Sequence, residues 1–214
     1  MESFFRYLPH IVWPSSCPVC GRLAVKICPE CLESLSGHFS RFCVSCGRDA
    51  PCGAHPDGLV CRSVSVYSGI NRDVVHAMKY SYCKAIALMM GEVMARILPK
   101  PGADFLVPIP LHKGGKREYN QAKLIAYGAG RIWNIPIKDC ARWNVDRKSQ
   151  ASSLDKTSRA LPSGVMTSNA GAEGKSVILV DDICTTGNTL LAAARALGEA
   201  GANPLGAMVW GRSV

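Results

Sequence analysis

One stretch near the C-terminus, residues 175–190, restricts the possible folds of this chain most. Residues 177–180 form a short apolar and mostly β-branched run, which predicts a buried strand of a parallel sheet. Asp181 and Asp182 follow this run directly, and a loop then leads into an Ala- and Leu-rich segment that we expect to be helical. The order of strand, acidic pair, loop and helix is typical of an α/β protein.

The loop after the acidic pair has the chemistry of a phosphate site. Its members are Thr185, Thr186, Gly187, Asn188 and Thr189. Backbone N–H groups, hydroxyl donors and the positive end of a helix dipole together suit a phosphate. Because the two carboxylates repel that phosphate, we expect them to face sugar hydroxyls or a metal ion. A sugar phosphate satisfies both parts, and an ordinary strand–helix turn with a Thr or Asn cap is the simpler alternative.

The segment V-I-L-V-D-D-I-C-T-T-G resembles the 5-phosphoribosyl-1-pyrophosphate (PRPP) signature of type I phosphoribosyltransferases. The resemblance implies that Asp181 and Asp182 are the catalytic acids and contact the 2′- and 3′-hydroxyls of the ribose. It also implies that residues 185–189 hold the 5′-phosphate. Mg²⁺ would bridge oxygens of the pyrophosphate and the ribose, because the carboxylates cannot balance that charge.

Length and composition favour a globular protein with anionic partners. The 214 residues allow one ordinary domain and a small module, and 48% of them are hydrophobic. The formal net charge of +9 favours nucleotides, PRPP or nucleic acid as partners. No apolar run reaches the roughly 18 residues of a membrane span, and the N-terminus lacks the features of a signal peptide. We therefore predict a cytoplasmic protein without a membrane span.

Eight of the eleven cysteines lie within the first 61 residues. Without a secretion signal, this density favours metal binding over disulfides. Four of these cysteines form a C-x2-C-x7-C-x2-C pattern, namely Cys17, Cys20, Cys28 and Cys31. Two short knuckles of this kind can place four thiolates tetrahedrally around Zn²⁺. The pattern predicts a structural zinc site.

The cysteines that follow predict a second zinc site with an open fourth ligand. Cys43 and Cys46 form another knuckle, and Cys52 supplies a third ligand. The fourth ligand is either His55, in a C-x2-H pair with Cys52, or Cys61 further along the chain. A single zinc ion shared between the knuckles, with the remaining thiols free, is the alternative to two ions.

Two polar segments are candidates for binding a pyrophosphate and for covering the site. A basic, glycine-bearing loop follows an expected strand and contains Lys113, Lys116 and Arg117. A cationic loop at the carboxyl edge of a parallel sheet suits a pyrophosphate. The resemblance to phosphoribosyltransferases implies that the polar segment 146–159 closes over the site as a lid, because a loop at this position does so in that family; a plain surface linker is the alternative.

The order of motifs along the chain resembles the ComF/GntX family of competence proteins, which are type I phosphoribosyltransferase-like proteins with an N-terminal zinc finger. The resemblance rests on the cysteine knuckles, K-Y at 79–80, V-P-I-P-L at 107–111, N-Q at 120–121 and V-D-D-x-x-T-T-G at 180–187. It implies a role in DNA uptake or natural transformation, with single-stranded DNA or DNA-processing proteins as partners. Lys79 could place a cation near a phosphate, and a solvated lysine at a helix end is the alternative.

We predict a Rossmann-like α/β domain with a mainly parallel sheet over residues 62–214. An N-terminal segment with a double zinc-finger module precedes it over residues 1–61. Strands are expected at 62–67, 104–110, 135–143, 177–180 and 205–212, and helices at 74–97 with an interruption at 79–83, from 119 onward and at 190–200.

Two functions are compatible with these features. The preferred hypothesis is a PRPP-binding phosphoribosyltransferase-like protein, and the alternative is a non-enzymatic DNA-binding or scaffold protein with a vestigial PRPP site. The sequence contains no evident nucleophile or strong general base for such a reaction. Any catalysis would therefore depend on positioning and charge stabilisation.

Overall fold

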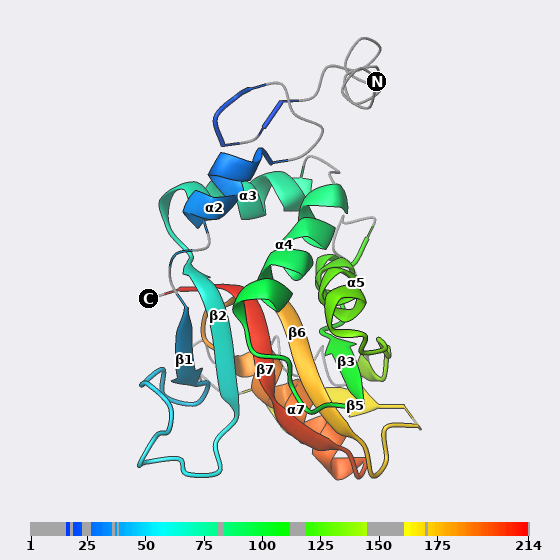
Figure 1. Cartoon of the computed structure of the whole chain (residues 1–214). Coiled ribbons are helices and arrows are strands. Elements are labelled where there is room, and N and C mark those ends of the chain that lie inside the picture. The colour runs from blue at the N-terminus through cyan, green and yellow to red at the C-terminus, as the bar shows by residue number, and fades with distance from the viewer. Residues whose placement is uncertain are drawn as a thin grey trace.

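The structure is a computed structural model of the chain. It describes residues 16–17, 19–22, 27–35, 37, 39–80, 84–111, 119–144, 161–169 and 171–213. Its elements form one mainly parallel sheet with helices on both faces (Figure 1). The predicted α/β fold with a mainly parallel sheet is confirmed.

The central sheet has five strands in the order β1-β2-β7-β6-β3. Their bounds are β1 Ser40–Cys43, β2 Val60–Val66, β3 Phe105–Pro108, β6 Ser176–Cys184 and β7 Asn203–Arg212. Strands β2, β7, β6 and β3 are parallel, and β1 is antiparallel to β2 at one edge. The carboxyl ends of the four parallel strands therefore meet at the edge where ligands bind in open α/β sheets.

Strand β6 is an interior strand that pairs with β7 on one side and with β3 on the other. Val177 and Leu179 belong to one core cluster, and Ile178 and Val180 belong to the cluster on the opposite face. Burial on both faces explains why the sequence is continuously apolar rather than alternating. The strand extends to Cys184, so the acidic pair lies within its end and not after it.

Three helices cover one face of the sheet: α3 Gly69–Tyr80, α4 Lys84–Ile97 and α5 Gln121–Trp133. Helices α4 and α5 touch backbone to backbone. A Cβ atom added to Gly91 would lie 2.0 Å from the Ile125 carbonyl oxygen, and one added to Gly128 would lie 2.0 Å from the Leu88 carbonyl oxygen. Both positions therefore require glycine.

None of the helices among the described residues has the length and apolar character of a membrane span.

The other face carries α7 Asn188–Glu199 and a two-stranded sheet of β4 Ala141–Trp143 and β5 Met166–Ser168. The strand expected over residues 135–143 is shorter than predicted. Only β4 and an isolated bridge between Leu106 and Ile137 form there. Pro136 has no N–H group to donate to a strand ladder, which explains the interruption.

The cysteine-rich part contributes α2 Pro29–Leu35 and the edge strand β1. Strand β1 pairs with β2 through contacts that include Phe42 with Cys61. The expected boundary between residues 61 and 62 falls inside β2, so the second knuckle is attached directly to the sheet. The division into a zinc module and a phosphoribosyltransferase-like domain stays a prediction.

Candidate functional site

The acidic pair lies near the carboxyl end of β6, between β7 and the edge strand β3. Asp181 is in register with Val209 of β7, and its Oδ1 accepts a hydrogen bond from the Asp182 N–H at 2.8 Å. Asp182 is buried, with 8% of its surface exposed, and Asp181 is half-buried. Burial and the adjacent Asp182 carboxylate raise the pKa of Asp181 well above its ordinary value. The pair therefore needs a cation or hydrogen-bond donors nearby to hold two charges.

Lys79, in the last turn of α3, supplies one cation. Its Nζ lies 2.7 Å from Asp182 Oδ2, and the two side chains are only 17% and 12% exposed. The end of α3 is also held by Tyr119, whose hydroxyl donates to the Met78 carbonyl. The structure therefore brings Lys79 into an enclosed ion pair with the acidic pair rather than into solvent.

The loop after β6 enters α7 through Gly187, which caps the helix in the left-handed region at φ 75° and ψ −5°. Glycine adopts this conformation without the penalty that a Cβ atom brings. Thr185 and Thr186 of the loop are exposed. Asn188 and Thr189, which were expected in the loop, are half-buried and lie in the first turn of α7, because the helix begins directly after the Gly187 cap. Within the described residues, no side chain caps α7, whereas the Asn120 side chain caps α5. The first N–H groups of α7 are therefore open to an anion.

The described residues next to the basic loop and next to the predicted lid lie at this same edge of the sheet. The Ile109 N–H donates to the Val180 carbonyl at 2.9 Å, next to the acidic pair. Asn120 Nδ2 donates to the Ile109 carbonyl at 2.9 Å, and the Trp143 indole donates to the Pro110 carbonyl at 2.9 Å. The predicted pyrophosphate residues Lys113, Lys116 and Arg117 and the predicted lid at 146–159 lie outside the described residues.

The predicted metal ligands gather into two clusters. The first contains Cys17, Cys20, Cys28 and Cys31, and the second contains Cys43, Cys46, Cys52 and His55. In each cluster the ligand atoms all lie within 4.8 Å of one another. The structure therefore groups His55, and not Cys61, with the three cysteines of the second knuckle.

The two clusters share one backbone design. In the first, the Gly21 N–H donates to the Cys17 carbonyl at 2.9 Å, and in the second, the Gly47 N–H donates to the Cys43 carbonyl at 2.8 Å. Both glycines have φ 72°. This tight turn lets the two cysteines of each C-x2-C knuckle point toward one centre.

The distances within the clusters fit a tetrahedral ion. The Sγ atoms of Cys20 and Cys28 are 3.6 Å apart, and those of Cys46 and Cys52 are 3.4 Å apart. Zinc–sulfur bonds of about 2.3 Å place neighbouring sulfurs about 3.8 Å apart in a tetrahedron. A hydrogen bond with His55 is the main cause that lowers the pKa of Cys52 to about 6, which favours the thiolate that a metal requires. Both clusters could therefore hold zinc.

Cys61 lies in the core instead, close to Cys184 at the end of β6. Burial raises the pKa of Cys61 well above its ordinary value, and its side-chain contact with Cys184 lowers the pKa of Cys184. The Arg212 guanidinium contributes to the lowering at Cys184. Arg212 is in register with Cys184, and its guanidinium lies 4.2 Å from the centre of the Phe42 ring. The position of Arg212 could not be predicted, because nothing near it in the sequence indicates its contact with Phe42.

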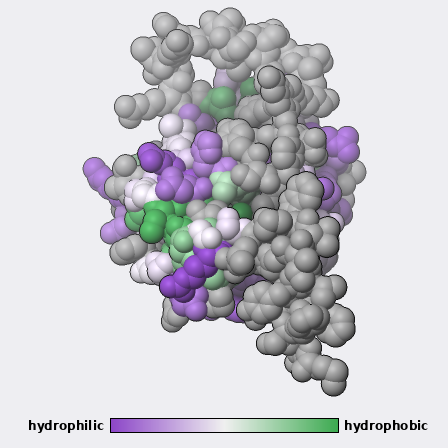
Figure 2. Space-filling model, turned by 90° about the horizontal axis from the view of Figure 1, so that it is seen from above, coloured by the Kyte–Doolittle hydropathy of each residue, from purple (hydrophilic) through white to green (hydrophobic). Residues whose placement is uncertain are grey.

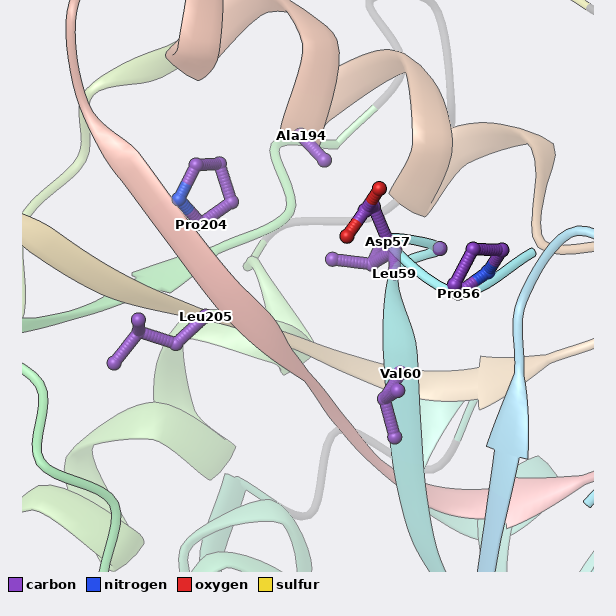
Figure 3. A pocket seen from close by; sticks show the side chains of 8 residues that line it. Pro56, Asp57, Leu59, Val60, Ala194, Pro204 and Leu205 are labelled. Carbon is purple, nitrogen blue, oxygen red and sulfur yellow. The ribbon is translucent and has the colours of Figure 1, made fainter. Parts of the chain in front are cut away.

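Two further surface features lie among the described residues. Seen from above, the described surface is mainly hydrophilic and contains a small hydrophobic area (Figure 2). A hollow of about 370 Å³ lies elsewhere, between the start of β2 at Val60, the start of β7 at Pro204 and Leu205, and Ala194 of α7 (Figure 3). Because β2 and β7 start there, the hollow lies at the amino edge of the sheet, opposite the acidic pair. Asp57 is the one charged side chain among its described lining residues.

Two sequence comparisons identify relatives of the chain. The family described as phosphoribosyl transferase domain matches residues 141–210, which include β6 and α7. Competence protein ComFC of Bacillus subtilis (strain 168) is 32% identical over 201 residues, covering 82% of this chain and 79% of that protein. The chain belongs to the ComF family. The predicted resemblance to ComF proteins of the type I phosphoribosyltransferase class is thereby confirmed.

Solved structures resemble this ComF-family chain more distantly. Adenine phosphoribosyltransferase from Thermoanaerobacter pseudethanolicus matches with a TM-score of 0.40 and 15% identity, over 64% of this chain and 72% of that chain. A glutamine PRPP amidotransferase from B. subtilis, solved with ADP and GMP, matches with a TM-score of 0.39 and 18% identity, over 57% of this chain and 25% of that chain. The ComF-family chain thus spans a quarter of the amidotransferase.

Proposed function

We propose that this chain binds PRPP together with Mg²⁺ at the carboxyl end of β6. The observation that carries the proposal is the N-terminus of α7, which no side chain of the described residues caps, shortly after the acidic pair at the end of β6. Residues 185–189 would bind the 5′-phosphate through hydroxyl and N–H donors. Asp181 and Asp182 would accept hydrogen bonds from the ribose hydroxyls. Lys113, Lys116 and Arg117 would face the pyrophosphate.

The ion pair between Lys79 and Asp182 supports the proposal that the acidic pair binds ribose hydroxyls and not a phosphate. Nζ of Lys79 is 2.7 Å from Asp182 Oδ2, so one carboxylate already has a cation. A neighbouring ribose can then bring hydroxyl donors to Asp181 without leaving two charges uncompensated. Bound Mg²⁺ would balance the phosphate charges of the ligand. Any transfer reaction would depend on this positioning and charge stabilisation, since no strong nucleophile lies among the named residues.

Isothermal titration calorimetry with PRPP and MgCl₂ tests the proposal. We expect heat of binding for the wild-type protein and for Asp57→Asn, which changes an acid at the opposite edge of the sheet. We expect the double variant Asp181→Asn/Asp182→Asn to lose binding, because it replaces two charged acceptors for the ribose hydroxyls with weaker amide oxygens. Equal heats for the wild type and the double variant would show that the acidic pair does not bind the ligand.

We also propose that each cysteine cluster holds one structural Zn²⁺ ion in a cytoplasmic protein. The sulfur–sulfur distances of 3.4 and 3.6 Å support tetrahedral binding. A reducing compartment keeps such thiols available to metal rather than in disulfides. Metal analysis of the purified protein should find two zinc ions for each chain.

A role in natural transformation or DNA uptake is the cellular function that we propose for this site. The support is the similarity to a protein named competence protein ComFC and the net charge of +9. The alternative of a non-enzymatic protein that binds single-stranded DNA, or that serves DNA-processing proteins as a scaffold, uses the same charge. Fluorescence anisotropy with a single-stranded oligonucleotide separates the two. If the protein binds DNA through phosphate contacts, its affinity should fall steeply between about 50 and 200 mM salt. An affinity that does not change with salt would refute binding of DNA through phosphate contacts.

A further inference from the structure

The second cysteine knuckle touches the candidate phosphate loop. Val44 lies between the predicted ligands Cys43 and Cys46 and is 5% exposed. A Cβ atom added to Gly187 would lie 2.3 Å from Val44 Cγ1 and 3.0 Å from the Val44 carbonyl oxygen. The cap of α7 is thus packed directly against the turn of the knuckle. In Figure 1, α7 lies behind the sheet, and β1 lies at the sheet edge next to β2.

The knuckle is fixed to the sheet on both sides of Val44. The Val44 N–H donates to the Leu59 carbonyl at 2.9 Å, directly before β2. On the other side, the Arg212 guanidinium donates to the Gly47 carbonyl. Arg212 is in register with Cys184, the last residue of β6. The turn that carries Val44 is therefore held between β2 and the strand ends that form the candidate site.

The first cysteine cluster has a different neighbourhood. Cys17 and Cys28 belong to the core cluster on the α3 and α4 face, whereas Val44 belongs to the cluster on the α7 face together with Cys184 and Leu190. Among the described residues, the close neighbours of Gly187 belong to Val44 and not to the first cluster. The two metal clusters therefore offer a natural comparison, because only the second abuts the phosphate loop.

We propose that the second knuckle positions the phosphate loop, with Val44 as the positioning residue between them. This inference rests on the proposed function of the loop as the 5′-phosphate site. Four ligands on one ion fix the Cys43–Cys46 turn, and the turn then presses Val44 against Gly187. Without that support, the loop 185–187 and the first N–H groups of α7 lose the fixed geometry that binds a phosphate. Removal of metal from the second cluster should therefore weaken ligand binding, and removal from the first should not.

A matched pair of variants tests the coupling. Cys20 and Cys46 are each the second, exposed cysteine of a knuckle, so Cys20→Ser and Cys46→Ser should each remove one zinc ion. We expect Cys46→Ser to weaken PRPP binding in calorimetry by about tenfold, which corresponds to about 1.4 kcal/mol of lost phosphate contacts. Cys20→Ser should stay within about twofold of the wild type. Equal weakening by both variants would overturn the proposal, since it would mean general destabilisation.

A second pair leaves the metal in place, so it stays informative if Cys46→Ser fails to fold. Val44→Ala removes the Cγ1 atom that packs against Gly187 and leaves the Val44 carbonyl in place, whereas Ser45→Ala changes the exposed neighbour in the same turn. Both should keep two zinc ions, but only Val44→Ala should weaken PRPP binding. Unchanged PRPP binding by Val44→Ala, with both zinc ions present, would overturn the proposal.

Amide hydrogen exchange of the unliganded protein separates this inference from the proposed function. Peptides that cover residues 185–192 should exchange faster in Val44→Ala and Cys46→Ser than in Ser45→Ala and Cys20→Ser. If the wild type does not bind PRPP, the proposed function fails while this comparison still tests the contact. Equal exchange in all four variants would refute the coupling.

Discussion

The Lys79–Asp182 ion pair makes a quantitative prediction. Its atoms are 2.7 Å apart and its side chains are 17% and 12% exposed, so Lys79→Met leaves a buried carboxylate without its cation beside a second carboxylate. Breaking an enclosed pair from one side costs several kcal/mol, and partial exposure lowers this to about 2–3 kcal/mol of unfolding free energy here. With a urea slope of about 2–3 kcal/mol per M, the midpoint of urea unfolding should fall by about 1 M.

Two controls identify the cause of that loss. The double variant Lys79→Met/Asp182→Asn should recover much of the stability, because the unpaired charge is then gone. Lys175→Met breaks the exposed pair with Asp104, whose atoms are 3.5 Å apart and whose side chains are 49% and 42% exposed, so its urea midpoint should barely move. The reasoning is refuted if Lys79→Met and Lys175→Met shift the midpoint equally, or if the double variant is less stable than Lys79→Met.

Three further predictions follow from the geometry. His55→Ala should reduce the zinc content from two ions to one, whereas Cys61→Ala should leave two, as measured by atomic absorption; the reverse result would restore Cys61 as a ligand. The raised pKa of Asp181 makes the folded protein hold that proton more tightly, so stability is lost as pH rises above the ordinary value of 3.8. Asp181→Asn should therefore unfold at higher urea than the wild type at pH 8, a gain that shrinks toward pH 4. Gly128→Ala should lower the free energy of unfolding by about 3 kcal/mol, while Gly198→Ala, which meets no atom within 4 Å, should be neutral or stabilising.

Features encoded within a few neighbouring residues could be predicted from the sequence. The apolar run of β6, the loop at 185–189 and α7 follow one another directly, so each identifies the next. The C-x2-C spacing of both knuckles likewise defines a local turn, and the glycine after each second cysteine permits it. The extension of β6 through the acidic pair was missed, because aspartate disfavours strands and only pairing with β7 extends the strand so far.

Contacts between distant parts of the chain could not be predicted in the same way. The choice of His55 over Cys61 depends on Cys61 lying within β2, where its side chain faces the core beside Cys184. The partner of Lys79 depends on how α3 ends above the sheet, and the contact of Val44 with Gly187 depends on β1 joining the sheet edge. These positions carry no local pattern, because tertiary packing alone brings them together.

A crystal structure of the protein with PRPP and Mg²⁺ tests the central claim most directly. The account predicts the 5′-phosphate at the N–H groups of residues 185–189 and the ribose hydroxyls beside Asp181 and Asp182. Density for PRPP in the hollow beside Asp57 at the opposite edge, with the end of β6 free of ligand, would contradict it.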